Sequence, residues 1–417
     1  MSYDVIVIGA GAAGMTAAYF AAVQGASVLL LDKNSKTGRK LRITGKGRCN
    51  LTNNSDVQEV LAHIPSGGKF LYSALSAFPP DAVMLFFEGH GLPLKTERGK
   101  RVFPQSDNAN DVANLLEKLC RNNGVQFRQG EVTGISIRDS RVKGIKLYAE
   151  SLDCKTCIIC TGGLSYPLTG STGDGYRFAK SLGHTVTELR PSLVPLECED
   201  DCCGRLQGLS LKNVELRVYE NGGLIDRGQG EMLFTHFGVS GPLVLSASAK
   251  MRHFGQARYR LEIDLKPGLD ERTLDQRILR DLHKYQNKAF HNSLYDLVPH
   301  ALVPELLQLC GADNELRANN VTKETRQKLL RALKAFPLSV TGTRPYDEAI
   351  VTSGGVNTKE LNPRSMGSKM ISGLFFAGEV IDLDAYTGGF NLQIAWSTGR
   401  LAGISAAEYC KQNEQQE

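Results

Sequence analysis

The pattern of apolar and polar positions at the start of the chain predicts a βαβ unit. Asp4–Ile8 is a short apolar run, Ala10–Gly25 is rich in small residues, and Ser27–Asp32 is a second apolar run that ends on an acid. Short apolar runs of this length are typical of buried strands, and the segment between them is long enough for a crossover helix. This order favours an α/β domain with a parallel sheet.

The rest of the chain changes pattern several times. Helices are expected over Asp107–Asn123 and Gln393–Tyr409, strands over Cys154–Cys160 and Gly373–Gly378, and a hairpin or small meander over Val125–Leu147. Alternating segments from Pro191 to about Asp264, and again over Pro337–Val351, predict antiparallel strands, whereas Pro267–Ala332 has helical periodicity. We therefore expect a discontinuous α/β domain (1–191 and 356–417), a β domain inserted into it (192–265 and 333–355), and a helical insert within that (266–332).

A glycine motif occupies the first strand–helix junction. Gly9-Ala10-Gly11-Ala12-Ala13-Gly14 has the form G-x-G-x-x-G. The first glycine makes the tight turn, the second lets the backbone approach a pyrophosphate, and the third lets the helix pack closely on the strand. Asp32, at the end of the second strand, is placed to accept hydrogen bonds from a ribose. These features predict a site for the adenosine diphosphate half of a dinucleotide.

A second glycine-rich region near the C-terminus favours FAD over NAD. Ala377-Gly378-Glu379 ends a predicted strand, and Gly388–Gln393 leads into the last predicted helix. The amides of a helix N-terminus there could face the electron-rich N1–C2=O edge of a flavin. No further glycine fingerprint follows a later strand, so a dedicated nicotinamide domain is not expected. NADH or NADPH remains a candidate transient electron donor.

Several longer segments resemble the signature of one bacterial family. These segments are Gly38-Arg39-Lys40, Thr44–Asn53 (TGKGRCNLTN), Thr161–Pro167 (TGGLSYP), Gly170–Gly175 (GSTGDG), Leu233–Pro242 (LFTHFGVSGP), Thr343-Arg344-Pro345 and Gly388–Gln393 (GGFNLQ). The family comprises NAD(P)/FAD-dependent oxidoreductases and includes aminoacetone-oxidase-like and BaiN-like flavoproteins. The resemblance covers essentially the whole chain and implies a glutathione-reductase-like, Rossmann-type FAD domain with an inserted β-barrel and a small helical insert.

The motifs and the resemblance together imply a cofactor site drawn from many segments. Its expected members are Gly9, Gly11, Ala12, Ala13, Gly14, Asp32, Lys33, Arg39, Lys40, Thr44, Gly45, Gly47, Arg48, Cys49, Asn50, Val132, Thr161, Gly162, Gly163, Gly378, Glu379, Asp382, Gly388, Gly389, Asn391, Leu392 and Gln393.

Basic residues are concentrated in two places. The loop Lys33–Arg48 holds seven cations and no acid, and Lys95, Arg98, Lys100 and Arg101 form a second cluster. The loop cations are expected to meet the FAD pyrophosphate, to form a solvated basic face, or to contact a polyanionic substrate. The second cluster would suit RNA backbone contacts. The formal net charge of +5 over 417 residues permits an RNA partner without requiring one.

Three residues are candidates for catalysis. Cys49 could donate a proton or be a small packed residue, and a disulfide-reductase dithiol is not expected because no second cysteine lies near it. His236 could bind substrate, act as a general acid, or be a hydrogen-bonded structural histidine. Arg344 could hold an anionic or carbonyl group over the flavin, or pair with Asp347 or Glu348.

A metal site is not expected. Cys154, Cys157 and Cys160 sit on one predicted strand, where residues three apart point to opposite faces, and a fourth ligand at suitable spacing is missing. Cys198, Cys202 and Cys203 would need ligands from elsewhere. Ten dispersed cysteines fit reduced thiols.

We therefore expect an FAD-dependent oxidoreductase that transfers hydride between FAD and an unidentified substrate. The resemblance offers two narrower versions, reduction of uridine to dihydrouridine in ribosomal RNA and an aminoacetone-type amine oxidase. A flavin- or RNA-binding regulatory protein is the non-enzymatic alternative. No apolar run reaches the roughly 18 residues that span a bilayer, and no signal peptide is evident, so a cytoplasmic protein without membrane or DNA partners is expected.

Overall fold

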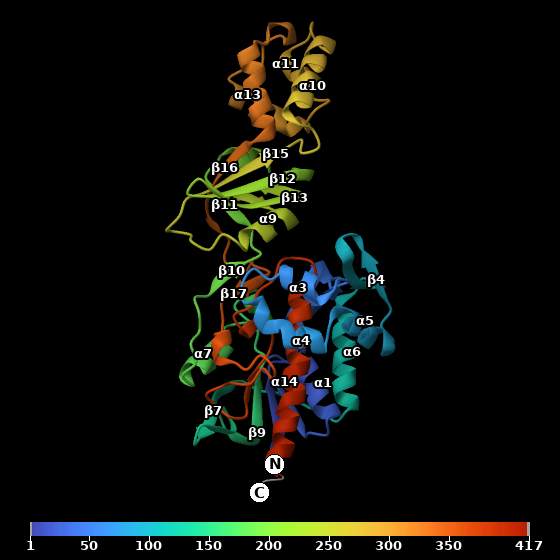
Figure 1. Cartoon of the computed structure of the whole chain (residues 1–417), viewed down its shortest axis with the longest axis vertical. Helices are drawn as coiled ribbons and strands as arrows, with labels where there is room; N and C mark the ends of the chain where they lie inside the picture. The colour runs from blue at the N-terminus through green and yellow to red at the C-terminus, as the bar shows by residue number, and fades with distance from the viewer. Residues whose placement is uncertain (1, 415–417) are drawn as a thin grey trace. The chain divides into compact units, whose positions relative to one another are not determined.

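The structure is a computed structural model that describes residues 2–414. It divides into two compact units, Met1–Ser192 with Tyr346–Glu417, and Leu193–Pro345. Each unit has its own cluster of buried apolar side chains. Figure 1 shows the elements of both units.

The first unit is built on a seven-stranded sheet with the order β6-β2-β1-β9-β8-β7, in which β18 also pairs with β9. Its strands are β1 (Tyr3–Ile8), β2 (Val28–Asp32), β6 (Gln126–Gln129), β7 (Val132–Arg138), β8 (Arg141–Leu147), β9 (Ser151–Ile159) and β18 (Leu374–Phe376). The pairs β1–β2, β1–β9, β2–β6 and β9–β18 are parallel. The carboxyl ends of β1, β2, β9 and β18 therefore meet at one edge, where ligands of open α/β sheets bind.

The predicted hairpin over Val125–Leu147 is only partly correct. Strands β7 and β8 form an antiparallel hairpin, but β6 pairs in parallel with β2. A four-residue strand carries no local sign of which neighbour it will join.

The helices α1 (Ala12–Val23) and α14 (Phe390–Glu414) pack on this sheet, and α6 (Ala109–Asn122) packs against α1. A Cβ at Gly399 or Gly403 of α14 would overlap the carbonyl oxygens of Ala13 or Ala17 in α1. These glycines let the two helices approach at backbone distance. The unit also contains α2 (Arg39–Ile43), α3 (Val57–Ala62), α4 (Tyr72–Ala77), α5 (Pro80–Gly89), α7 (Asp174–Ser181), β3 (Thr52–Asn53), β4 (Leu94–Glu97), β5 (Arg101–Pro104), β10 (Arg190–Ser192) and β17 (Val351–Ser353).

One helical stretch, Gly68–Gly89, is long and apolar enough by composition to cross a membrane. Within it, α4 ends at Ala77 and α5 begins at Pro80. Leu71, Leu75 and Phe87 of this stretch are buried in the apolar cluster of the first unit. These features are those of core helices in a globular domain.

The second unit contains a closed barrel with the order β11-β14-β13-β12-β15-β16. Its strands are β11 (Leu196–Cys198), β12 (Ser210–Glu220), β13 (Gly223–Thr235), β14 (Gly238–Ser240), β15 (Tyr259–Asp264) and β16 (Phe336–Thr343), accompanied by α8 (Cys202–Arg205) and α9 (Pro242–Ser248). Between β15 and β16 the chain forms α10 (Glu271–Lys284), α11 (Phe290–Leu294), α12 (Val303–Cys310) and α13 (Lys323–Lys334). Asp270 and Thr322 cap α10 and α13 by accepting hydrogen bonds from backbone amides.

The Rossmann-like fold with an inserted β-barrel and helices is confirmed. The observed division differs from the expected ranges at two points. Residues 346–355 belong to the first unit, where β17 pairs with β10. The helices and the barrel share one apolar cluster and form a single unit, because the helices bury Leu274 and Leu333 with barrel residues such as Leu338.

Candidate functional site

The glycine motif forms a cradle at the carboxyl end of β1. A Cβ at Gly14 would overlap the Gly9 carbonyl oxygen, and Gly9, at φ +103°, lies against the backbone of Cys160. A Cβ at Gly11, by contrast, would meet no atom within 4 Å. The loop is therefore closed on the protein side at two glycines and open on the ligand side at the third. Since Met15 N makes the hydrogen bond to Gly11 O (3.0 Å), the amides that precede it at the helix N-terminus are available for an anion.

Two polar groups beside the cradle fit the same ligand. The Asp32 Oδ1 atom accepts hydrogen bonds from Asn34 N (2.8 Å) and Asn34 Nδ2 (2.9 Å), whereas Oδ2 accepts only from Ala10 N (2.8 Å) among the described residues and keeps further acceptor capacity. Thr161 Oγ1, just after β9, is buried and has no hydrogen-bond partner within the described residues. A buried hydroxyl without a partner is costly. An open Gly11, a half-exposed acid and an orphaned hydroxyl together fit the diphosphate and ribose of FAD.

The C-terminal segment reaches the same edge of the sheet. Gly378 follows β18 at φ +77°, its amide donates to Thr398 Oγ1 (3.0 Å), and a Cβ there would lie 2.7 Å from the Ala13 Cβ of the cradle. Segments from both ends of the chain thus meet around one site.

Gly388 and Gly389 lie at the start of α14 against β3. Asn53 Nδ2 donates to Gly388 O (3.0 Å), and a Cβ at Gly389 would overlap the Thr52 backbone. The side chains of Asn391 and Gln393 are engaged within the protein: Asn391 bonds the backbone of Ala385, and Gln393 accepts from Thr52 Oγ1 (2.6 Å). Both residues therefore hold the loop in place, and their contacts with cofactor stay a prediction.

The predicted signature loop between α2 and β3 turns through left-handed conformations. Gly45, Lys46, Gly47 and Cys49 all have φ between +58° and +85°. Two of them carry side chains, and such backbone is uncommon for residues other than glycine. The loop is anchored to α14 by Trp396 Nε1, which donates to Leu51 O (2.8 Å).

Cys49 is completely buried in this loop. Burial raises the pKa of its thiol to about 12, against a smaller lowering effect of the Thr44 hydrogen bond. The thiol therefore keeps its proton at neutral pH and has no exposed path to substrate. This environment favours the packed alternative for Cys49 over proton donation.

Most cations of the basic loop have protein partners. Lys33 bonds Asp174 and Thr172, Arg39 bonds Asn34, and Arg42 bonds Asn110 and Asn114. Arg48 pairs with Glu97 (2.5 Å) and Asp107 (2.6 Å) and lies 4.2 Å from the Phe103 ring centre. A solvated basic face, one of the three alternatives for this loop, therefore does not describe these cations, because acids and amides of other segments and Asn34 of the loop itself pair with them.

Lys40 links three separate segments. Its Nζ contacts Glu379 Oε2 (2.7 Å) and Ser165 Oγ (2.6 Å), and Glu379 Oε1 accepts from Ser165 Oγ (2.9 Å) and Thr352 N (2.9 Å). Ser165 and Thr352 were not among the predicted site residues. Ser165 lies inside a family segment that could have indicated it, whereas nothing in the local pattern of Thr352 does.

The remaining predicted cofactor residues lie around the same edge of the first unit. Gly162 and Gly163 follow β9, and a Cβ at Gly163 would press on Thr352 and Glu379. Val132 begins β7 close to the end of β2, since the amide of Gly130 donates to Asp32 O (2.8 Å). Asn50 lies with its carboxamide 3.0 Å from Gly389 N, Asp382 follows η8 (Gly378–Val380), and Leu392 is half-buried in α14.

The second unit brings two of the predicted catalytic residues onto one aromatic ring. His236 is exposed in the turn between β13 and β14, with its ring 5.1 Å from that of Phe237. The Arg344 guanidinium lies 4.5 Å from the Phe237 ring centre and pairs with Glu197 (2.7 Å). Pairing of Arg344 with Asp347 or Glu348 stays a prediction. The roles of His236 and Arg344 in catalysis stay predictions.

The cysteines lie on the core elements as free thiols. Cys154, Cys157 and Cys160 are buried at or just beyond β9, and burial raises the pKa of each. Across residues 2–414, no group of three or more His, Cys, Asp or Glu side chains is placed to hold a metal ion.

A family model described as the HI0933-like protein Rossmann domain matches residues 3–405. The chain is 33% identical over 397 residues to a ribosomal RNA dihydrouridine synthase of Escherichia coli, a match that covers 95% of this chain and 96% of the relative. It is 30% identical to a 3-dehydro-bile acid delta(4,6)-reductase of Clostridium scindens, with 96% and 98% covered.

Solved structures show the same fold. A 3-ketosteroid delta1-dehydrogenase from Sterolibacterium denitrificans matches with a TM-score of 0.53 at 14% identity, over 98% of this chain and 99% of that one. The family match spans nearly the whole chain and agrees with the cradle at β1. This protein therefore belongs to the HI0933-like family of Rossmann-fold, FAD-dependent oxidoreductases.

Proposed function

We propose that this protein reduces uridine to dihydrouridine in ribosomal RNA, with FAD bound in the cradle of the first unit and NADH or NADPH as electron donor. The chemistry that FAD supplies when bound is hydride transfer to one carbon of the uracil C5=C6 bond, while the other carbon takes a proton. The chain's own residues hold the cofactor and position the polyanionic substrate.

One observation carries the choice of RNA. The turn between β4 and β5, with the first residue of β5, presents the exposed cations Arg98, Lys100 and Arg101. Lys100 also pairs with Glu59 (2.6 Å), in a solvent-exposed ion pair that contributes little and can be exchanged for a phosphate. This turn is hydrogen-bonded to the segments that are predicted to bind the cofactor. Asn53 Nδ2 donates both to Gly99 O (3.0 Å) and to Gly388 O (3.0 Å). The next amide, Asn54 N, donates to Lys100 O (2.7 Å). A cationic surface is therefore fixed beside the segment that is expected to bind the flavin, where an RNA backbone would have to pass.

The relatives support the same choice. Proteins of Escherichia coli and Haemophilus influenzae, 33% and 31% identical to this chain, are named ribosomal RNA dihydrouridine synthases. The bile acid reductase of Clostridium scindens is named for reduction of ring double bonds. Saturation of a carbon–carbon double bond is thus the reaction class common to both names.

The test is the product. Purified protein with FAD, NADPH or NADH, and ribosomal RNA transcribed in vitro should yield dihydrouridine, detected by mass spectrometry of the nucleosides under anaerobic conditions. Deleting the gene should remove dihydrouridine from cellular ribosomal RNA. Unchanged ribosomal RNA in both experiments would contradict the proposal, and flavin bleaching by small amines alone would favour the oxidase instead.

A charge variant isolates the RNA surface from the cofactor site. Replacing Arg98, Lys100 and Arg101 with Ala should weaken RNA binding strongly while the protein retains FAD. The matched control removes three exposed cations of the β7–β8 hairpin, Arg138, Arg141 and Lys143, which lie away from the β4–β5 turn. Equal losses in the two variants would show only a general effect of charge.

A further inference from the structure

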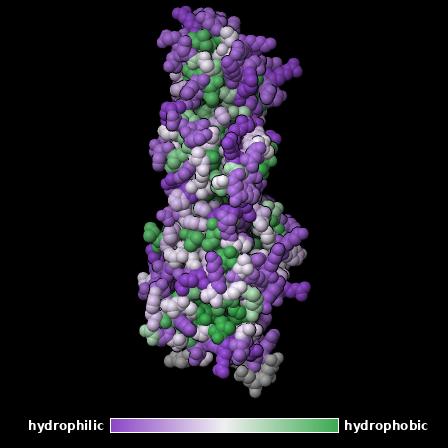
Figure 2. Space-filling model, turned by 90° about the vertical axis from the view of Figure 1, so that its left-hand side faces the viewer, coloured by the Kyte–Doolittle hydropathy of each residue, from purple (hydrophilic) through white to green (hydrophobic). Residues whose placement is uncertain are grey.

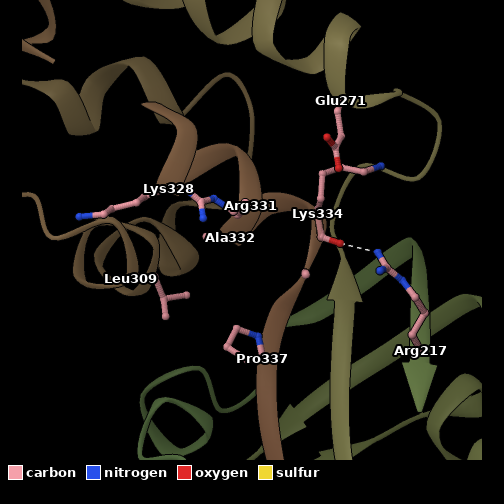
Figure 3. A pocket seen from close by; sticks show the side chains of 9 residues that line it. Arg217, Glu271, Leu309, Lys328, Arg331, Ala332, Lys334 and Pro337 are labelled. Atoms are coloured by element: carbon pink, nitrogen blue, oxygen red, sulfur yellow. Dashed lines mark hydrogen bonds between the residues drawn. The ribbon is translucent and has the colours of Figure 1, made fainter. Parts of the chain in front are cut away.

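A cavity of about 420 Å³ lies in the second unit where the helices join the barrel. Its lining comes from α10, α12, α13 and the strands β12 and β16, and includes Arg217, Glu271, Leu309, Lys328, Arg331, Ala332, Lys334, Ala335 and Pro337. Figure 3 shows these side chains around the junction of α13 and β16. The volume falls in the range of small-ligand sites.

Two of the four lining cations are committed to the fold. Arg217 donates to Lys334 O (2.6 Å) and pairs with Glu215 (3.2 Å), as drawn in part in Figure 3. Lys334 pairs with the buried Asp264 and donates to Leu269 O (2.9 Å). The Arg217 bond caps the C-terminus of α13, and the Lys334 side chain is tied to Asp264 and to the loop before α10, so Arg217 and Lys334 need no ligand to explain them.

The other two cations, Lys328 and Arg331, are exposed on the side of α13 that borders the cavity. Lys328 pairs with Glu324 (2.8 Å). Because both side chains are exposed to solvent, this ion pair contributes little to stability. Arg331 Nε donates to Gln327 O (3.3 Å). A guanidinium has five donors in a planar fork that matches a phosphate, and most of those of Arg331 face solvent.

The floor beside these cations is apolar. Leu309 of α12 is 42% exposed, and Ala332, Ala335 and Pro337 continue the surface toward the barrel. The upper end of the molecule in Figure 2 is mainly hydrophilic on the face shown, with a few hydrophobic side chains among the hydrophilic ones. An exposed leucine with two cations at its rim suits a nucleotide, because the phosphate can meet the cations while sugar and base cover the apolar floor.

We propose that this cavity binds one or two nucleotides of an RNA strand, with Lys328 and Arg331 on the phosphates and Leu309 under the adjoining nucleoside. Glu271 is the carboxylate of the lining, and its negative charge disfavours a phosphate on its own side of the cavity. The proposal rests on the proposed function, since RNA is the substrate of that reaction, and it adds an RNA contact in the second unit.

The experiment measures binding of in vitro transcribed ribosomal RNA across a series of salt concentrations. The double variant Lys328→Ala/Arg331→Ala should weaken binding by about tenfold or more, since charge-assisted hydrogen bonds are lost. The slope of log affinity against log salt concentration should become less steep by about 1.4, because each lost phosphate contact of a single strand accounts for roughly 0.7 and two contacts are lost. Leu309→Asn should weaken binding with little change in slope.

The matched control removes two exposed cations of the same helices outside the cavity, in Arg280→Ala/Lys323→Ala. FAD content and thermal midpoint should be unchanged in all variants. If the cavity variant binds RNA like the control, the inference is overturned. If wild-type protein binds RNA through these residues but forms no dihydrouridine, only the proposed reaction fails; if it binds no RNA, both fail.

Discussion

At the scale of single residues, two glycines of the cradle differ in their surroundings: Gly14 is packed against the protein backbone and Gly11 is not. Gly14 is needed because a Cβ would overlap the Gly9 carbonyl oxygen, whereas a Cβ at Gly11 would enter empty space. Gly14 is therefore required for the helix to pack on the strand, whereas Gly11 is expected to be required for ligand binding. The sequence motif contains both residues without distinguishing them.

We predict opposite consequences for alanine at these two positions. Gly11→Ala should fold with a thermal midpoint near that of the wild type but bind FAD at least tenfold more weakly, because the methyl group occupies the ligand side. Gly14→Ala should lower the midpoint itself, since the helix must shift. Thermal unfolding without FAD and fluorescence titration with FAD measure the two effects. Equal FAD affinity for wild type and Gly11→Ala would contradict this assignment.

His184 is a buried titratable residue of the first unit. Its Nδ1 lies 3.0 Å from Glu360, its Nε2 lies 2.9 Å from Ser368 Oγ, and its ring packs against Phe376. Burial lowers the pKa of His184 below 6.5, and Glu360 opposes that shift without reversing it. The unfolded chain therefore binds this proton more readily than the folded chain.

It follows that the free energy of unfolding should decrease as pH falls through and below 6.5. Above that pH His184 is neutral in both the folded and the unfolded chain, and its contribution to the free energy of unfolding is fully present. Replacing His184 with Gln should reduce the pH slope in this window, whatever its effect on stability at higher pH. Urea unfolding at a series of pH values measures the slope. Parallel profiles for the two proteins would exclude His184 as the source.

At the scale of elements, α1 and α14 approach each other at backbone distance in the first unit. A Cβ at Gly403 would overlap the Ala17 carbonyl oxygen and that at Gly399 the Ala13 carbonyl oxygen. Since Ala13 is in the cradle and α14 begins at Phe390, directly after Gly389, this contact links the two halves of the predicted cofactor site.

Gly403→Ala should therefore destabilise the protein by on the order of 1–3 kcal/mol through overpacking. It should also weaken FAD binding, because displacement of α14 moves its N-terminal loop. The control is Gln412→Ala, an exposed position near the end of the same helix, which should change neither quantity. Unchanged stability of Gly403→Ala would mean that the helices can separate at no cost.

At the scale of the whole molecule, two apolar clusters divide the chain. One comprises sheet and helix residues of Met1–Ser192 and Tyr346–Glu417, and the other joins the barrel to the helices of Leu193–Pro345. Units with separate cores can unfold separately. The predicted cofactor residues belong to the first unit, so FAD is expected to stabilise that unit alone.

Calorimetry should accordingly show two transitions, and saturating FAD should raise the midpoint of one. At a free concentration about 100-fold above Kd the stabilisation is about 2.7 kcal/mol. Gly11→Ala serves as the control, since it should reduce the FAD-dependent shift at the same FAD concentration. A single transition shifted as a whole would show that the units unfold cooperatively.

The sequence by itself determined the features that depend on near neighbours. The first βαβ unit, the glycine cradle and the helices over 267–332 follow from periodicity and from steric demands at single positions, which a short window contains. The preference for FAD over NAD also rests on local patterns. A glycine-rich turn precedes a helix near each end of the chain, at Gly9–Gly14 and at Gly388–Gln393.

Tertiary structure alone decided which distant groups meet. Lys40 and Glu379 are 339 residues apart, yet their ion pair joins both ends of the chain. The sequence leaves the partners of the basic loop open because Asp174, Glu97 and Glu379 lie elsewhere in the chain, and nothing in the local pattern of β6 indicates that it pairs with β2. Ion pairs and strand pairing depend on separation in space, which local pattern does not encode.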